Sequence, residues 1–180
     1  MSNRPRGLKT LTVVVRALAA LGAALFCAQI LVWLKIDWVR FAINEGMMGA
    51  GGGPIVIDGR ARLLGALGSL PSAALGVFAL WQLWRLLGGI AAGRRFDREA
   101  QVRLRRFAWA MLVTNLLPPL LERPWIGFAL TLGNPPGQHS LQLGFSWNDY
   151  VVILLSTVIL VVAVALPEAL GRAAGSQAPA

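Results

Sequence analysis

Long apolar runs separated by short polar segments dominate the pattern along this chain. A helix needs about 20 apolar residues, at about 1.5 Å each, to cross about 30 Å of hydrocarbon. The runs predict transmembrane helices over 11–34, 63–91, 103–121 and 149–168. The third run is the weakest, because its first turn is basic and Pro118-Pro119 is expected to stop the helix. A re-entrant helix is the alternative for that run.

A second pattern, alternation with period two, lies between the third and fourth runs in the loop 122–148. Large apolar residues occupy every second position in Ile126–Leu132 and again in Leu141–Trp147. The segment between them, Gly133–His139, has the composition of a turn. This pattern predicts a small extracytoplasmic β-hairpin between helices 3 and 4, to which Ile55–Ile57 would add a third strand.

These elements predict an all-α membrane protein: a four transmembrane helix bundle with the β-hairpin on its outer side. The membrane domain covers 11–170 and includes a first outer loop at 35–62. It follows a cytoplasmic segment, 1–10, and precedes a cytoplasmic tail, 171–180, that we expect to be disordered. Asp97 is the expected N-cap of the third helix.

Small and neutral polar residues predict how the helices pack. Gly65, Ser69, Ser72 and Gly76 recur at helical spacing and favour close approach of a neighbouring helix. We find no carboxylate, lysine or histidine near the middle of a predicted span, where a transporter or pump needs ionisable groups. The deep polar residues expected to form interhelical contacts are Gln29, Gln82, Asn115, Ser156 and Thr157. A substrate path along the three amides is the alternative.

Charge decides the expected orientation. Hydrophobic residues make up 56% of the chain, charged residues 14%, and the net charge is +9. The basic residues flank apolar runs, which indicates a topology signal and excludes a nucleic-acid partner. Twelve fall on the proposed inner side and five on the outer, so both termini are expected in the cytoplasm at a bacterial inner membrane. If the third helix does not cross, the C-terminus changes side.

The inner segment between helices 2 and 3 is the expected contact for anionic lipids or a protein partner. Its candidate residues are Arg94, Arg95, Arg98, Arg103, Arg105 and Arg106. A homo-oligomer is a further expectation. The chain has one histidine, His139, and one cysteine, Cys27, and neither sits in a catalytic or metal-ligand pattern. We therefore expect no enzyme activity, no metal and no cofactor.

The layout resembles a bacterial membrane family catalogued as domain of unknown function 2975. The matching residues are Gly93, Phe96, Asp97, Leu104, Arg105 and Arg106, followed by Leu154 to Glu168. The long Gly-rich first loop and the Ala-rich tail after Gly171 depart from the family pattern. The resemblance implies no activity. Some members look to be encoded beside small helix-turn-helix regulators, which suggests a sensory or regulatory role by analogy. We therefore expect a non-enzymatic sensory, regulatory or partner-binding subunit, with a small oligomeric transporter or channel as the alternative.

Overall fold

The computed structural model describes residues 6–33, 35, 50–51, 58–92, 97–131, 140–141 and 146–175. Four long helices form the framework: α1 (Arg6–Val32), α3 (Gly59–Ala91), α4 (Arg98–Leu117) and α6 (Trp147–Gly175). A π-helical turn, η1 (Pro118–Glu122), continues α4 into the short helix α5 (Arg123–Thr131). Two short strands, β1 (Ala50–Gly51) and β2 (Ser140–Leu141), pair antiparallel, with Ala50 opposite Leu141.

Side-chain caps explain where the helices begin. Asp58 accepts a hydrogen bond from the Ala61 N–H at 2.7 Å, so α3 starts at Gly59 rather than at residue 63. Asp97 accepts from the Ala100 N–H at 2.9 Å, which confirms it as the N-cap of α4. At the other end of the chain, α6 extends to Gly175, beyond the predicted end at 168. The expected disordered tail is therefore helical through residue 175, and residues 176–180 lie outside the described part.

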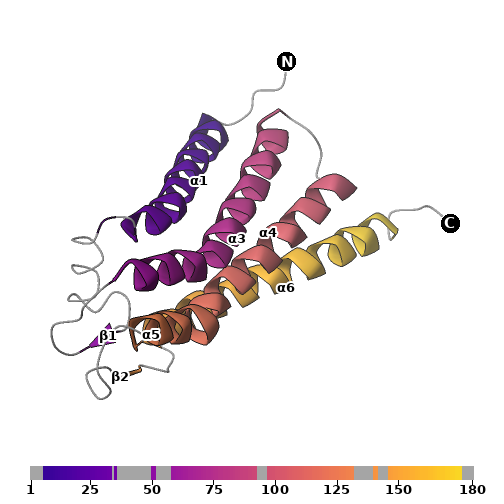
Figure 1. Cartoon of the computed structure of the whole chain (residues 1–180). Coiled ribbons are helices and arrows are strands. Elements are labelled where there is room, and N and C mark those ends of the chain that lie inside the picture. The colour runs from indigo at the N-terminus through magenta and orange to yellow at the C-terminus, as the bar shows by residue number, and fades with distance from the viewer. Residues whose placement is uncertain are drawn as a thin grey trace.

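The long helices stand in an open row, in the order α1, α3, α4, α6 (Figure 1). Helix α1 packs mainly on α3, and α6 packs on α4, so α3 and α4 occupy the middle. A small core between α3 and α4 contains Ala79, Phe107 and Ala110. Large apolar side chains remain on the outside, including Leu25 at 62% exposure and Leu155 at 58%. Apolar surface on this scale is typical of a lipid-facing protein.

The prediction of a fourth membrane span is wrong. Among the residues that the structure describes, three helical segments are long and apolar enough to cross a membrane: Thr10–Val32, Gly59–Ala91 and Trp147–Leu166. Helix α4 is excluded by its charges, since only 15 uncharged residues, about 23 Å of helix, separate Arg106 from Glu122. Helix α3 has 22 uncharged residues in succession, about 33 Å. Because α4 lies between α3 and α6, neighbouring helices cover two of its sides and it tolerates a lower apolar content.

The predicted β-hairpin is also wrong. Its first strand, Ile126–Leu132, falls in α5 as far as Thr131, where Ile126 and Ala129 face inward at helical spacing. A short apolar run is compatible with both the strand period of two and the helix period of 3.6. Here the preceding π-helical turn leads directly into another helix, so the helical period is the one adopted. In the described part of the second predicted strand, Leu141 pairs with β1 from the first loop rather than with Ile126–Leu132, and Trp147 begins α6. Ile55–Ile57 and Gly133–His139 lie outside the described residues.

Candidate functional site

Two consecutive prolines create the structural irregularity on which the candidate site is built. Pro118 and Pro119 have no backbone N–H, so they cannot continue the hydrogen-bond ladder of α4. The chain responds with a wider turn, in which the Arg123 N–H donates to the Pro118 carbonyl oxygen five residues earlier. We expected these prolines to stop the helix, and instead they change its pitch. The turn buries Pro119 and Glu122, and such π-helical turns are frequent at functional sites.

Glu122 is the central residue of this site, and its side chain joins three helical segments. It is 6% exposed. Its Oε1 accepts a hydrogen bond from Gln29 Nε2 of α1 at 2.7 Å. Its Oε2 accepts from Ser72 Oγ of α3 at 2.9 Å. The carboxyl group therefore connects α1 and α3 to the turn that follows α4, and we call Glu122, Gln29 and Ser72 the Glu122 joint.

The Ser72 hydroxyl gives the Glu122 joint two hydrogen-bonding arrangements. Its single hydrogen lies within reach of Glu122 Oε2 at 2.9 Å and of the Ser69 carbonyl at 3.0 Å. The hydroxyl can therefore donate either to Glu122 or to the Ser69 carbonyl of its own helix. Donation to Glu122 is the arrangement that connects α3 to the turn after α4.

A second polar contact lies next to the Glu122 joint and is centred on Trp33, at the end of α1. Trp33 is 1% exposed, and its indole N–H donates to Ser69 Oγ at 3.2 Å. Arg62 Nε donates to the Trp33 carbonyl at 3.0 Å. A Cβ on Gly65 would lie 2.3 Å from the indole ring, so only glycine admits the ring here. Helix α1 is thus held to α3 by Trp33 and by the Glu122 joint.

The predicted small-residue face of α3 takes part in this packing. Gly65, Ser69, Ser72 and Gly76 are all buried. A Cβ on Gly76 would lie 2.5 Å from the Phe26 ring of α1. The small residues therefore admit large aromatic rings as well as allowing close backbone approach.

The predicted deep polar residues have different environments. Gln29 is part of the Glu122 joint, and Asn115 Nδ2 donates to Ser156 Oγ of α6 at 2.7 Å. Gln82 is 3% exposed on α3. Thr157 is exposed and donates to the Ile153 carbonyl of its own helix at 2.8 Å, so it makes no interhelical contact through that bond.

The candidate arginines also differ in their surroundings. Arg103 forms a salt bridge with Glu99 and also donates to the Arg85 carbonyl. Arg98, Arg105 and Arg106 are exposed. Arg94 and Arg95 lie outside the described residues. The structure therefore separates a paired arginine from exposed ones that the sequence alone treats as one group.

Two arginine–tryptophan contacts lie near the end of the row where α3 finishes and α4 begins, and we call them the arginine–tryptophan belt. The Arg16 guanidinium lies 4.2 Å from the centre of the Trp84 ring, and that of Arg85 lies 5.0 Å from Trp81. Tryptophan and basic residues gather where a bilayer meets water. The belt therefore gives α1 and α3 the side-chain pattern that is typical of helix ends at a bilayer surface.

Sequence reasoning missed Glu122 because it assigned position 122 to an outer loop. The signal that could have found it is an acidic residue flanked by Leu120-Leu121 on one side and Trp125-Ile126 on the other. It also missed the ion pair between Arg123 and Asp149, whose two bonds measure 2.6 and 2.9 Å. Within the described residues, no group of three histidine, cysteine or acidic side chains is arranged to hold a metal ion.

A comparison with known families gives one match. The model of the family described as "Protein of unknown function (DUF2975)" matches residues 56–177, which is more than half of the chain. The matched region contains Ser72 and Glu122, whereas Gln29 and Trp33 lie before it. No curated protein and no solved structure matches the chain.

Proposed function

Because the chain belongs to the DUF2975 family of proteins of unknown function, we propose a function from its own geometry. It is a non-enzymatic regulatory or sensory subunit of a bacterial inner membrane, and the Glu122 joint couples α1 to the rest of the row. The observation that supports this most directly is the buried carboxyl group on a π-helical turn, hydrogen-bonded to two other helices. Ionisable groups buried in membrane proteins are kept mainly for function.

The orientation we propose follows from the distribution of charge. The end of the row where α3 finishes and α4 begins holds Arg85, Arg98 and Arg103, and the arginine–tryptophan belt lies near it. The start of α1 and the end of α6 both lie away from β1 and β2 (Figure 1). They share a side because α4 runs back between α3 and α6, although it is not one of the candidate spans. We place the basic end in the cytoplasm, because cytoplasmic segments are enriched in lysine and arginine. The β1–β2 pairing then lies on the outer side.

Two of the amides favour helix coupling over a transport path. The amide groups of Gln29 and Asn115 donate hydrogen bonds to Glu122 and Ser156, which ties them to neighbouring helices. A path for a substrate needs polar groups that turn toward the substrate. The contacts formed by these two amides therefore support a joint between helices.

Distance measurements between spin labels test the coupling. Cys27 is exposed on α1, two residues from Gln29, and a second label is introduced as Val162→Cys on the exposed face of α6. We expect Glu122→Ala to shift or broaden the distance distribution between the labels, because it removes both acceptors at the joint. Glu122→Gln is the matched control, since its amide accepts from Gln29 and donates to Ser72.

The proposal fails if Glu122→Ala leaves the distances unchanged in a folded, membrane-inserted protein. The regulatory part has a separate test in copurification from native membranes. We expect replacement of Arg94, Arg95 and Arg98 by glutamine to lose a cytoplasmic partner without loss of insertion. Unchanged recovery of all partners would contradict a regulatory role at this end.

A further inference from the structure

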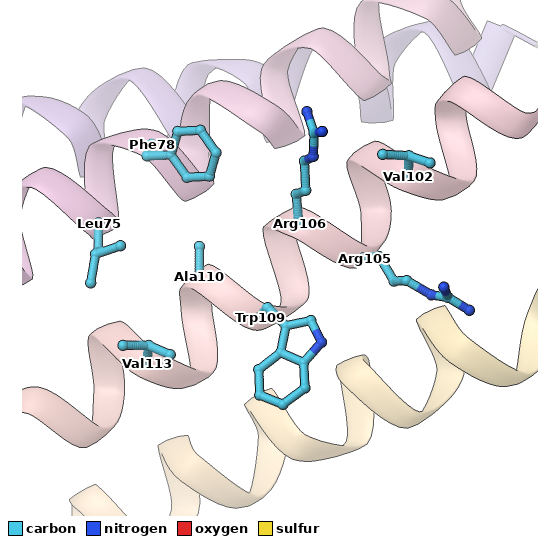
Figure 2. Close-up of a pocket in the computed structure, with 8 residues that line it drawn as sticks. All are labelled: Leu75, Phe78, Val102, Arg105, Arg106, Trp109, Ala110 and Val113. Atoms are coloured by element: carbon cyan, nitrogen blue, oxygen red, sulfur yellow. The ribbon is translucent and has the colours of Figure 1, made fainter.

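An apolar groove runs along the face of the row between α3 and α4 (Figure 2). Its volume is about 500 Å³, within the range of small-molecule sites. Its lining residues are Leu75 and Phe78 of α3, with Val102, Arg105, Arg106, Trp109, Ala110 and Val113 of α4. The three large apolar chains Phe78, Trp109 and Val113 remain 39%, 55% and 36% exposed. The groove therefore offers apolar surface that the chain itself leaves uncovered.

Positive charge lies at one end of this groove. Figure 2 shows Arg106 rising from α4 toward α3, while Arg105 and Trp109 extend on the side of α6. None of the described residues that line the groove is acidic. Within the described part of the chain, neither Arg105 nor Arg106 forms a salt bridge, whereas Arg103 pairs with Glu99. The two arginines thus present unneutralised charge beside an apolar channel.

The length of the groove matches one leaflet of a bilayer. From Val102 to Val113, α4 rises about 17 Å, compared with about 30 Å for the whole hydrocarbon core. Arg105 and Arg106 lie toward the start of α4, on the side of the arginine–tryptophan belt, whose side-chain pattern is typical of a bilayer surface. The charged end therefore coincides with the headgroup level, and Val113 and Leu75 lie deeper in the membrane.

We propose that this groove is a binding site for a single anionic phospholipid of the cytoplasmic leaflet. One acyl chain lies along Phe78, Trp109 and Val113. Arg106 contacts the headgroup phosphate from the α3 side, and Arg105 contacts it from the α6 side. Guanidinium groups recognise phosphate through charge-assisted hydrogen bonds. This assigns a bound lipid to one place on the protein, beyond the general attraction of basic residues to an anionic membrane.

Native mass spectrometry of the full chain in mild detergent tests the site. The probes are phosphatidylglycerol and phosphatidylcholine with identical acyl chains. We expect one phosphatidylglycerol to be retained per chain, in preference to phosphatidylcholine. An arginine near an anionic lipid surface strengthens binding about fivefold. The double variant Arg105→Gln, Arg106→Gln should therefore bind the lipid about thirtyfold more weakly.

Two matched controls separate the site from nonspecific effects. Arg60→Gln removes one charge from an exposed position outside the groove and should change affinity less than twofold, whereas Arg106→Gln alone should weaken binding about fivefold. Val113→Trp fills the deep end of the groove and should reduce retention about tenfold or more. Val161→Trp makes the same replacement on the exposed face of α6 and should leave retention unchanged.

Several results would overturn the proposal. Equal weakening by Arg60→Gln and Arg106→Gln would mean general electrostatic attraction. If Val113→Trp retains phosphatidylglycerol fully, the acyl chain does not lie in the groove. Displacement of the lipid by inorganic phosphate or glycerol phosphate would mean an anion site without a chain. A dimer that forms in place of the lipid complex would mean that a second copy covers this face.

Discussion

Gly65 provides the sharpest test of the packing that holds α1 to α3. A Cβ at this position would lie 2.3 Å from one atom of the Trp33 ring and 2.4 Å from two others. The ring has little room to move, because Trp33 is 1% exposed and its indole N–H is bonded to Ser69. Gly65→Ala therefore forces Trp33 out of its place and breaks that hydrogen bond.

The expected loss of stability follows from three contributions. Overpacking at a buried site costs about 1–3 kcal/mol. Loss of the Trp33–Ser69 hydrogen bond adds about 0.5–1.5 kcal/mol. The higher helix propensity of alanine offsets about 1 kcal/mol of this loss. The net destabilisation is therefore about 2 kcal/mol, within a range of roughly 0.5–3.5 kcal/mol.

The assay is the free energy of unfolding in mixed detergent micelles, followed by near-ultraviolet circular dichroism. Gly89→Ala is the control in the same helix, because no atom lies within 4 Å of its added Cβ. We expect this control to be neutral or slightly stabilising. In a Trp33→Ala background the cost of Gly65→Ala should largely disappear. The steric argument is wrong if the Gly65→Ala protein is as stable as the parent. It is also wrong if Gly65→Ala lowers the free energy of unfolding equally in the parent and in the Trp33→Ala background.

Two further predictions use the same assay. Gly68→Ala brings a Cβ within 2.2 Å of the Trp125 ring, but that ring is 41% exposed and can turn outward. We expect the free energy of unfolding to fall by about 0.5–1.5 kcal/mol, mainly because the Trp125 indole loses its hydrogen bond to the backbone of α3. A larger fall than for Gly65→Ala would refute this. A double-mutant cycle of Asn115→Ala and Ser156→Ala should give a coupling of about 0.6 kcal/mol, the average for interhelical bonds in membranes, and zero coupling would contradict the bond.

The sequence was sufficient to predict an element where its local pattern and its burial in the fold favour the same structure. Long uncharged runs predicted α1, α3 and α6, which are the three helices that the structure identifies as candidate spans. Asp97 was recognisable as an N-cap because its side chain acts within the next turn. The small face of α3 was recognisable from its spacing alone. These features depend on residues close together in the chain.

The errors arose where neighbours distant in sequence decide the structure. Helix α4 has a charged first half, and it was read as a span because its apolar second half was extended as far as Leu121. The period-two pattern at Ile126–Leu132 was real, but helical continuation through the π-helical turn determined the structure of α5. Glu122 could not be placed, because its partners Gln29 and Ser72 are 93 and 50 residues away.

The open row has a consequence for how the molecule comes apart. In a closed bundle each helix has two neighbours, so removing one disrupts the whole. Here α1 is a terminal element that packs mainly on α3, and the family match begins after it, at residue 56. In such a linear array each helix is stabilised mainly by its direct neighbours, so a terminal helix can separate without unfolding the others, as in repeat proteins. Helices α1 and α6 are the two terminal elements, and α1 is the one that lies outside the family match. We therefore expect α1 to separate first, or to exchange with the α1 of another copy, while α3, α4 and α6 stay assembled.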